Sequence, residues 1–356
     1  MTRPVRILIV GVGGIGGTIA ANLLRHHSGP AAPEVTGLTR NRAIASAIAS
    51  HGYRLTGADG QASVPGTTIA SPDEATGSFD WIFLATQPPH MEEAARGVAH
   101  LLASDGAMVV MQNGLPEERI ARIVGPDRVV GCIVSWGAHM PEPGLFDRTS
   151  AGGFTIGSLD GKTEDEMRPL ATLLEVIGPV KHTGNLRGAR WTKLAFNCAI
   201  STLGTIGGDR FGPLVRYQVT RTLALRIFTE VVAVAQAEGV ALEKLGGTLD
   251  LEWISLTQAE RNAQMGTSSL VAKHSLLLAV GVRYRRLRSS MLSAIERGRP
   301  PAVDFLNGEI VERGRNHGVD VPLNTAATEL VHRIARGDET SSVQTMRSLL
   351  EVGTLN

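Results

Sequence analysis

The feature that most constrains the fold is a glycine-rich turn close to the start of the chain. The apolar run VRILIV, residues 5–10, leads directly into GVGGIG, residues 11–16, and TIAANLLRHH, residues 18–27, follows. The β-branched run predicts a buried strand, and the segment after the turn has a helical pattern. Strand, tight turn and helix in this order form the context in which GxGxxG binds a dinucleotide pyrophosphate, the alternative being a turn that binds nothing. The predicted cofactor-binding turn comprises Gly11, Val12, Gly13, Gly14, Ile15 and Gly16.

The next predicted strand, EVTGLTR at residues 34–40, indicates which dinucleotide is bound. A site for NAD places an acidic residue at the carboxyl end of this strand, to bond the ribose 2′-hydroxyl. That end carries Arg40, and Glu34 lies at the opposite end. A guanidinium pairs well with a 2′-phosphate, so the sequence favours NADP(H). The alternative is that Arg40 is a solvated loop charge.

Further strand-like runs alternate with a helical segment at residues 91–104 and predict a mostly parallel, doubly wound sheet. The expected strands cover residues 79–86, 107–114, 128–136 and 153–159. Ligands bind at the carboxyl ends of such strands, where Gln87 and Asn113 fall. Asn113 is therefore predicted to face the nicotinamide and the substrate. The alternative is that the QNG segment is only a turn.

The second half of the chain has the period of helices. The helical segments are 189–203, 214–238, 268–280, 286–297, 302–317 and 324–336. We therefore predict an α/β protein in which a Rossmann-type NADP-binding domain, residues 1–186, precedes an all-helical substrate and dimerisation domain, residues 187–356. A cleft between two such domains is a preferred place for a small-molecule site.

The helical segment WTKLAFNCAI, residues 191–200, contains polar side chains in an apolar setting. Lys193, Asn197 and Ser201 are four residues apart and form one polar line on a helix that is predicted to be buried all round. A buried ammonium is costly and its pKa falls, so the lysine either pairs with a carboxylate or lines a cleft. In a cleft, Lys193 would donate a proton to a carbonyl oxygen, with Asn197 holding the geometry. The alternative is a lysine that snorkels to the solvent.

Composition narrows the class of partner. The formal charge is +1 and 43% of residues are hydrophobic, which favours neither a nucleic-acid surface nor a basic membrane patch. No run approaches the ~20 apolar residues of a membrane span. The histidines and the two cysteines show no metal-binding spacing. We therefore expect a cytoplasmic protein with a small-molecule substrate and no metal.

At these motifs the chain resembles the ketopantoate reductase (2-dehydropantoate 2-reductase) family, within the superfamily whose helical domain is like that of 6-phosphogluconate dehydrogenase. The resemblance rests on GVGGIG (11–16), Arg40, QNG (112–114), WTKLAFN (191–197), RSSML (288–292) and FLNGEIVERGRNHGVDVPLNT (305–325). It implies NADPH-dependent reduction of a 2-oxo acid to a 2-hydroxy acid in pantothenate biosynthesis, and a homodimer formed through the helical domain.

The resemblance also implies roles for individual residues. Lys193 matches the general acid, and Asn113 and Asn197 match groups that position substrate and cofactor. Ser290 matches a contact to the substrate carboxylate, and Ser201 extends the same line. Gln87 takes the place of a family lysine near the cofactor.

Several positions depart from the family pattern. Besides Gln87, three residues differ from the family: Ser201 and Leu287 each replace an asparagine, and Ala302 replaces an important glutamate. Asp304 lies two residues after Ala302 and therefore falls on a different helix face. A pocket without these partners should bind the hydroxylated family substrate poorly. The sequence therefore leaves open a reductase for a bulkier or less polar 2-oxo acid or ketone, an imine-reducing enzyme, and a non-catalytic NADP-binding protein.

Overall fold

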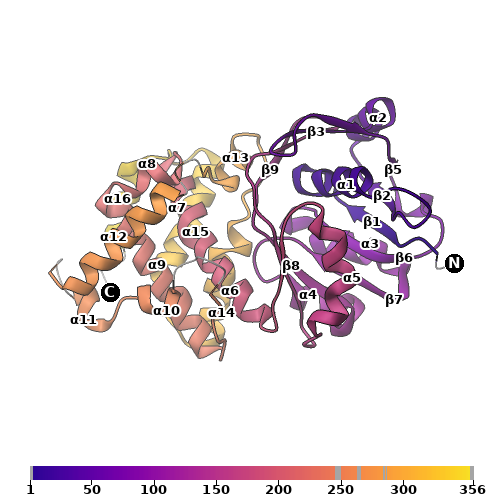
Figure 1. The fold of residues 1–356 in the computed structure, drawn as a ribbon. Helices are drawn as coiled ribbons and strands as arrows, with labels where there is room; N and C mark the ends of the chain where they lie inside the picture. Colours follow the sequence, from indigo (N-terminus) through magenta and orange to yellow (C-terminus); the bar gives the residue numbers. More distant parts are fainter. Residues whose placement is uncertain (1–2, 245–249, 263–265, 284, 286, 353–356) are drawn as a thin grey trace. The chain divides into compact units, whose positions relative to one another are not determined.

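The computed structural model describes residues 3–244, 250–262, 266–283, 285 and 287–352. The chain divides into two compact units, Met1–Leu186 and Arg187–Asn356 (Figure 1). The first unit is built on a mixed sheet with helices and the second is helical, which confirms the predicted fold class. The functions predicted for the two units stay predictions.

Within residues 3–186 the main sheet has eight strands. In sheet order these are β12 (Val180–His182), β11 (Phe154–Ser158), β8 (Val129–Val134), β7 (Leu102–Val110), β6 (Phe79–Leu84), β1 (Arg6–Val10), β2 (Glu34–Leu38) and β5 (Thr67–Ile69). The neighbours pair in parallel except β8 and β11, which are antiparallel. The chain order reverses at β1, which lies between β2 and β6, and such a switch point is where open α/β sheets bind ligands.

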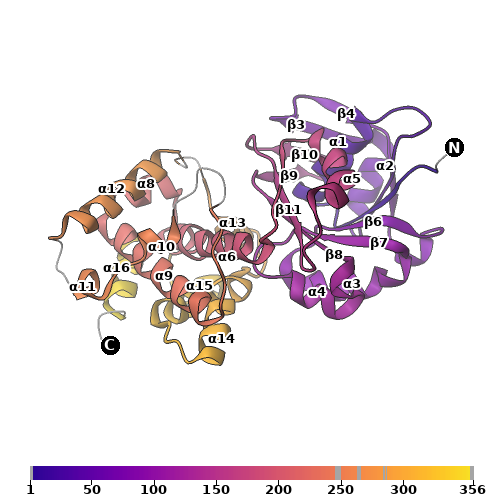
Figure 2. The same cartoon turned by 60° about the horizontal axis from the view of Figure 1, so that its bottom comes forward.

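Helices cover both faces of this sheet, because alternate side chains of each strand point to opposite faces. Ile7 and Ile9 pack on one side with α1 (Gly14–His26) and α5 (Glu164–Glu175). Leu8 and Val10 pack on the other side with α3 (Met91–Val98) and α4 (Glu117–Val124) (Figure 2). The remaining helical segments of this unit are α2 (Arg42–His51) and the short turns η1 (Pro72–Glu74), η2 (Pro88–His90), η3 (Ala99–Leu101) and η4 (Pro126–Arg128).

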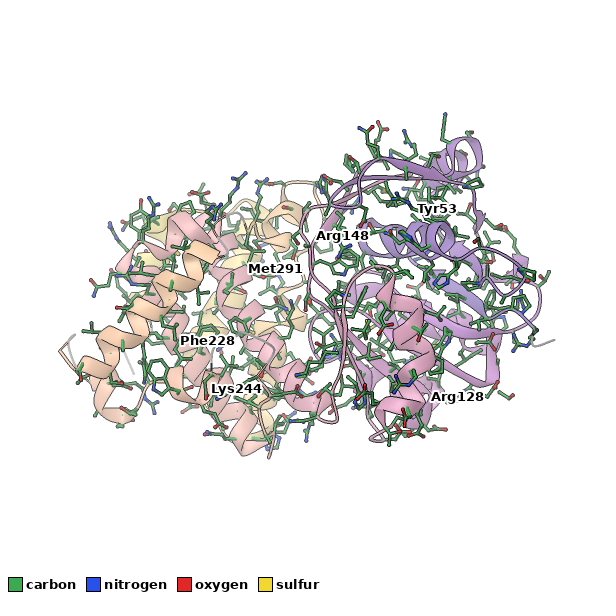
Figure 3. The ribbon with its side chains drawn as sticks, viewed as in Figure 1. Tyr53, Arg128, Arg148, Phe228, Lys244 and Met291 are labelled. Carbon is green, nitrogen blue, oxygen red and sulfur yellow. The ribbon has the colours of Figure 1, made fainter. Side chains whose placement is uncertain are left out.

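A second sheet packs over α1, and the sequence did not reveal it. Its strands, in order, are β4 (Ala62–Val64), β3 (Tyr53–Gly57), β10 (Leu145–Arg148) and β9 (Ala138–Glu142). Phe146 stacks on Tyr53 with ring centroids 5.9 Å apart, and its ring occupies the place of a Cβ that Gly17 of α1 lacks. Arg148 ion-pairs with Asp59 at 3.0 Å, and both side chains are 7% exposed; Tyr53 and Arg148 are labelled in Figure 3.

The second unit is an assembly of helices. They are α6 (Leu186–Phe196), the π-helical turn η5 (Asn197–Ser201), α7 (Thr202–Gly207), α8 (Phe211–Val215), α9 (Gln218–Ala237), α10 (Leu251–Ile254), α11 (Gln258–Asn262), α12 (Ser268–Arg283), α13 (Ser290–Ile295), η6 (Val303–Phe305), α14 (Asn307–His317), α15 (Pro322–Arg336) and α16 (Val343–Val352). The long helix α9 contacts η5, α10, α12, α14, α15 and α16. Its Phe228, labelled in Figure 3, is fully buried and meets the ring of Phe196 edge-on.

Three predicted helices are shorter or broken in the structure outside the segment that carries Lys193, and the one expected at 214–238 divides into the end of α8 and α9, which begins at Gln218. The helix expected at 286–297 begins only at Ser290, because the Ser289 hydroxyl accepts a bond from the Leu292 N–H and caps it; residue 286 lies outside the described residues. The helix expected at 302–317 is broken after η6, where the backbone at Leu306 is not helical.

No helix in the part of the chain that the structure describes combines the length and the apolar character of a membrane span.

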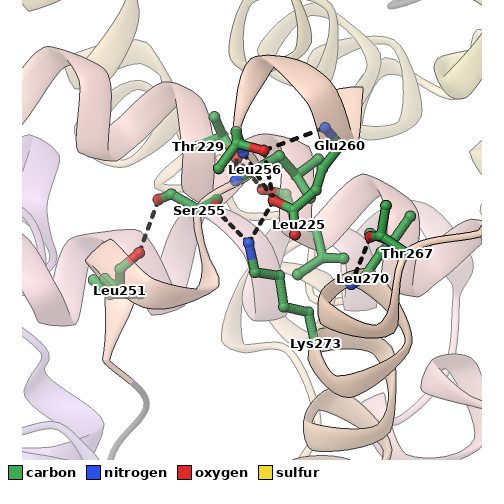
Figure 4. Close-up of polar contacts among 10 residues, drawn as sticks. Leu225, Thr229, Leu251, Ser255, Leu256, Glu260, Thr267, Leu270 and Lys273 are labelled. Carbon is green, nitrogen blue, oxygen red and sulfur yellow. Dashed lines mark hydrogen bonds and ion pairs between the residues drawn. The ribbon is translucent and has the colours of Figure 1, made fainter. Parts of the chain in front are cut away.

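A buried ion pair joins α11 to α12 (Figure 4). Lys273 Nζ lies 2.6 Å from the Glu260 carboxylate, and the two side chains are 3% and 5% exposed. Lys273 also donates to the Ser255 carbonyl at 2.8 Å, and the Thr257 N–H donates to Glu260 at 2.9 Å. Burial raises the pKa of Glu260, but the bonds from Lys273 and Thr257 outweigh it and hold that pKa at about 2.

We expect Lys273→Met to destabilise the fold by about 3–5 kcal/mol at neutral pH, because it leaves Glu260 buried without its partner. The folded pKa of Glu260 is below its ordinary value of 4.5, so the pair stabilises the fold fully above that value. Its contribution is lost as the pH falls from about 4.5 to about 2. Thermal unfolding across this range should therefore show the melting temperatures of variant and wild type converging at low pH.

The matched control is Arg336→Met, which breaks an ion pair whose side chains are 59% and 54% exposed. Exposed pairs contribute at most about 1 kcal/mol, so this variant should melt close to the wild type. Equal destabilisation by the two substitutions would contradict a stabilising role of the Lys273–Glu260 pair. A difference in melting temperature between Lys273→Met and wild type that persists at low pH would contradict it as well.

Candidate functional site

The glycine-rich turn is shaped by close backbone contacts. Gly11 has φ +98°, and a Cβ there would lie 2.8 Å from the Thr86 nitrogen. A Cβ on Gly16 would lie 2.2 Å from the Gly11 oxygen, so the turn and the first helical turn pack directly on each other. A Cβ on Gly13 would meet nothing within 4 Å, so this side of the turn is open.

The open space beside Gly13 adjoins the N-terminus of α1. Gly13 is the N-cap residue, no side chain caps the helix, and its first turn holds no acidic residue. The first N–H groups of a helix lack intrahelical partners and carry partial positive charge. A backbone concavity of this kind accommodates a pyrophosphate, so the residues present fit the predicted dinucleotide.

Two neighbouring turns lie beside the glycine-rich turn. The Ala85 N–H bonds the Val10 carbonyl at 2.9 Å, and the Met111 N–H bonds the Leu84 carbonyl at 3.2 Å. The Gln112 amide nitrogen donates to the Thr86 hydroxyl at 3.2 Å. The carboxyl ends of β1, β6 and β7 are thereby joined into one edge.

The side chains of the predicted Gln87 and Asn113 are exposed at this edge. Gln87 precedes η2, and Asn113 precedes Gly114, which has φ +97°. The structure therefore brings both residues close to the glycine-rich turn. The partly buried bond between Thr86 and Gln112, which links their two turns, was not predicted from the sequence, because it joins side chains 26 residues apart.

Arg40 lies just beyond the carboxyl end of β2. Its side chain is 75% exposed and pairs with the exposed Glu93 at 3.2 Å. The next residue, Asn41, caps α2 by accepting from the N–H groups of Ala43 and Ile44. Glu34 pairs with Arg6 at the opposite end of the strand. An exposed guanidinium with a single exposed carboxylate partner is available to a phosphate ligand.

In the helical unit, Lys193 and Asn197 lie where α6 passes into the π-helical turn. No carboxylate and no hydrogen-bond partner among the described residues acts on the pKa of the Lys193 amine. Burial lowers the pKa of Lys193, and the charge of Arg190 lowers it further. The Asn197 Nδ2 atom is buried and has no hydrogen-bond partner within the described part of the chain. An amine and an amide without partners are available to a ligand.

The structure around Lys193 differs from the predicted one. We predicted one regular helix at 189–203 that is buried all round. The structure instead interrupts it at Asn197–Ser201, and the side chains of Lys193, Asn197 and Ser201 are half-buried, so the polar line is an accessible face of this helix. Sequence periodicity assumes α-helical spacing and cannot register a wider turn that depends on a distant partner.

The two serines of RSSML have different environments. Ser290 is exposed at the first position of α13. Ser289 is buried, and its hydroxyl lies 2.7 Å from the Thr205 hydroxyl of α7. Thr205 follows Ser201 by four residues, so Ser289 fastens α13 to the helix that carries the polar line. The bond between Ser289 and Thr205 was not predicted from the sequence, because the two residues are 84 positions apart.

Besides Gln87 and Ser201, the positions that depart from the family pattern lie just before α13 and η6. Leu287 is 43% exposed, and its carbonyl accepts the Phe211 N–H. Ala302 is half-buried just before η6. Asp304 is exposed and bonds His332 of α15 at 2.8 Å. The Asp304 carboxylate is thus engaged with α15, and that it does not replace the missing glutamate stays a prediction.

The predicted site residues therefore form two sets, one at the sheet edge of the first unit and one along α6, η5 and α13 of the second. That they share one cleft, and the role of each residue, stay predictions.

Comparison with known proteins agrees with this architecture. The model "Ketopantoate reductase PanE/ApbA" matches residues 7–161, and its C-terminal model matches residues 185–335. A 2-dehydropantoate 2-reductase of Mesorhizobium japonicum is 26% identical, covering 93% of this chain and 98% of the relative.

Two solved structures have the same fold. One is a PanE/ApbA family ketopantoate reductase from Ralstonia eutropha JMP134, with a TM-score of 0.76 and 24% identity over 94% of this chain and 100% of that one. The other is a D-mandelate dehydrogenase with NADH and anilino(oxo)acetate, with a TM-score of 0.76 and 20% identity over 97% of this chain and 99% of that one. With family models that match both units, the chain belongs to the ketopantoate reductase family.

Proposed function

We propose that this chain catalyses the NADPH-dependent reduction of a 2-oxo acid to a 2-hydroxy acid, with ketopantoate as the first candidate substrate. The observation that carries the proposal is the half-buried Lys193, an amine without an ion-pair partner among the described residues, one helical turn from the unpartnered Asn197 amide. Membership of the ketopantoate reductase family, through both units, supports the same reaction.

The first unit would hold the cofactor, which supplies a hydride when bound. The start of α1 and the open side of the turn at Gly13 would bind the pyrophosphate. Arg40 would exchange its exposed partner Glu93 for the 2′-phosphate of NADP(H). Gln87 and Asn113, at the carboxyl ends of the neighbouring strands, would contact the nicotinamide side.

The second unit would supply the proton and hold the substrate. Lys193 would donate its proton to the carbonyl oxygen as negative charge develops there. Its lowered pKa makes it a stronger acid than an ordinary lysine, which favours the transfer near neutral pH. The Asn197 amide would donate to the same oxygen, and Ser201 and Ser290 would bind the substrate carboxylate.

A second candidate is the same reaction on a bulkier or less polar 2-oxo acid. Ala302 and Leu287 place apolar side chains where the family carries a glutamate and an asparagine, and Asp304 is engaged with His332. A pocket that has lost polar partners discriminates against a hydroxylated substrate. The fold is also that of a D-mandelate dehydrogenase, so it is compatible with a substrate other than ketopantoate.

The family resemblance supports three further parts of the proposal. The enzyme would work in the cytoplasm as a homodimer formed through the helical unit, and with ketopantoate as substrate it would belong to pantothenate biosynthesis. Light scattering of the purified chain tests the dimer directly.

We expect Lys193→Ala to lower kcat/KM by about 100- to 10,000-fold while the affinity for NADPH is kept, because only proton donation is removed. In the wild type, the rate should fall as the pH rises through the Lys193 pKa, below its ordinary 10.5, since the acid must be protonated. The pH profile and a cofactor titration measure both effects. Lys181→Ala, at an exposed lysine of β12, is the matched control; similar losses in both variants would remove Lys193 from the reaction.

We expect Arg40→Ala to raise the KM for NADPH by about 10- to 100-fold, as charge-assisted hydrogen bonds to a phosphate are lost. The KM for NADH should change little, since NADH has no 2′-phosphate. Arg96→Ala, which removes an exposed arginine of α3, serves as the control. An equal change with both cofactors would show that Arg40 does not read the 2′-phosphate.

The substrate is tested by following NADPH oxidation with ketopantoate beside a panel of 2-oxo acids and simple ketones. We expect turnover of at least one 2-oxo acid. If a bulkier acid is preferred over ketopantoate, Ala302→Glu should shift the kcat/KM ratio towards ketopantoate, because it restores a polar partner. Tight NADPH binding without any turnover would instead identify a non-catalytic NADP-binding protein.

A further inference from the structure

One α-helical backbone hydrogen bond is missing in the segment that carries Lys193, Asn197 and Ser201. In an α-helix the Thr202 N–H would donate to the Cys198 carbonyl, four residues earlier. In the structure the Thr202 N–H bonds the carbonyls of Asn197 and Ala199 instead. The Cys198 carbonyl therefore lacks the donor that it would have in a regular α-helix, although Cys198 is fully buried. A buried carbonyl without a partner is costly, so this turn depends on a donor from elsewhere.

Asn307, at the start of α14, supplies that donor. Its Nδ2 atom donates to the Cys198 carbonyl at 3.2 Å, and its Oδ1 atom accepts from the Thr202 hydroxyl at 2.6 Å. A single fully buried side chain thus occupies the gap between the two residues that would have paired in a regular helix.

Two further buried groups hold Asn307 in place. Its Nδ2 atom also donates to Asn324 Oδ1 at 2.9 Å, and Asn324 Nδ2 donates to the Glu230 carboxylate of α9 at 2.7 Å. Glu230 in turn accepts the N–H groups of Leu323 and Asn324 at the start of α15, both at 2.9 Å. The π-helical turn is therefore tied to α9, α14 and α15, and every group in this chain of bonds has a partner.

The wider turn changes which residues are aligned. In an α-helix each step of four residues rotates by about 40° beyond a full turn, so a line of three such positions drifts around the helix. A π-helical turn advances by less rotation per residue, because its bonds span five residues. Over Asn197–Ser201 this reverses the drift and brings Ser201 back towards the line of Lys193.

We propose that Asn307 is a positioning residue for the reaction, because it stabilises the π-helical turn that aligns Ser201 with Lys193 and Asn197. The proposal rests on the proposed function of these three residues. Asn307 itself is fully buried and bonded to protein groups, so it acts on the substrate only through this alignment.

The test is Asn307→Leu, which keeps the size of the side chain and removes its donor and acceptor. We expect kcat to fall by about 10- to 100-fold, the effect of a small misplacement of reacting groups, with the KM for NADPH unchanged. In a Ser201→Ala background the same substitution should cost much less, because the aligned hydroxyl is already absent.

The control for general destabilisation is Lys273→Met, which disrupts the buried pair of α11 and α12 in the same unit. It should lower the melting temperature without a comparable loss of kcat. The proposal is wrong if Asn307→Leu and Lys273→Met lower the melting temperature equally and also lower kcat equally. It is also wrong if the losses of kcat from Asn307→Leu and Ser201→Ala simply multiply in the double variant. Either result would show that Asn307 has only a structural role.

A crystal structure of Asn307→Leu separates this proposal from the proposed function. We expect the Thr202 N–H to return to the Cys198 carbonyl and Ser201 to rotate away from Lys193. An unchanged π-helical turn would overturn the proposal whatever the activity. Absence of 2-oxo acid reduction by the wild type would overturn the proposed function, while the crystal structure would still decide whether Asn307 holds the turn.

Discussion

The requirement that a buried backbone carbonyl find a donor organises the helical unit. The Cys198 carbonyl is satisfied by Asn307, whose amide is held by Asn324, whose amide is held by Glu230. This chain of bonds fixes the start of α14 and α15 against α9 and the interrupted helix. Apolar side chains such as Phe228 are buried in the same unit, and the polar chain adds directional bonds between its helices.

In the first unit, backbone bonds and one side-chain bond join the turns at the edge of the sheet. Three turns at the carboxyl ends of β1, β6 and β7 are joined by the Ala85 and Met111 N–H groups, and Gly11 and Gly16 allow the turn and α1 to touch. Side chains are thereby left free for a ligand, and Gln87 and Asn113 are exposed at this edge. A rigid backbone frame with free side chains is what precise orientation of a cofactor requires.

The sequence was informative where structure depends on neighbours in the chain. GVGGIG after a β-branched run identified the turn, and helical spacing placed Lys193, Asn197 and Ser201 on one line. The π-helical turn could not be foreseen, because it depends on a bond between Cys198 and Asn307, 109 residues apart. The second sheet was missed for the same reason, since the short strand β10 pairs with the distant β3. The strand β11 was predicted at residues 153–159, but strand–helix alternation did not indicate that it runs antiparallel to β8.

The pairing of β10 with β3 has a consequence for how the chain acquires its structure. Phe146 fills the space beside Gly17, and Tyr53 stacks on that ring, so α1 is covered on its outer side by a strand synthesised long after it. Contacts between such distant segments form slowly, because the long intervening loop must close first. During synthesis the outer side of α1 therefore becomes covered only after residues 145–148 have emerged and paired with β3.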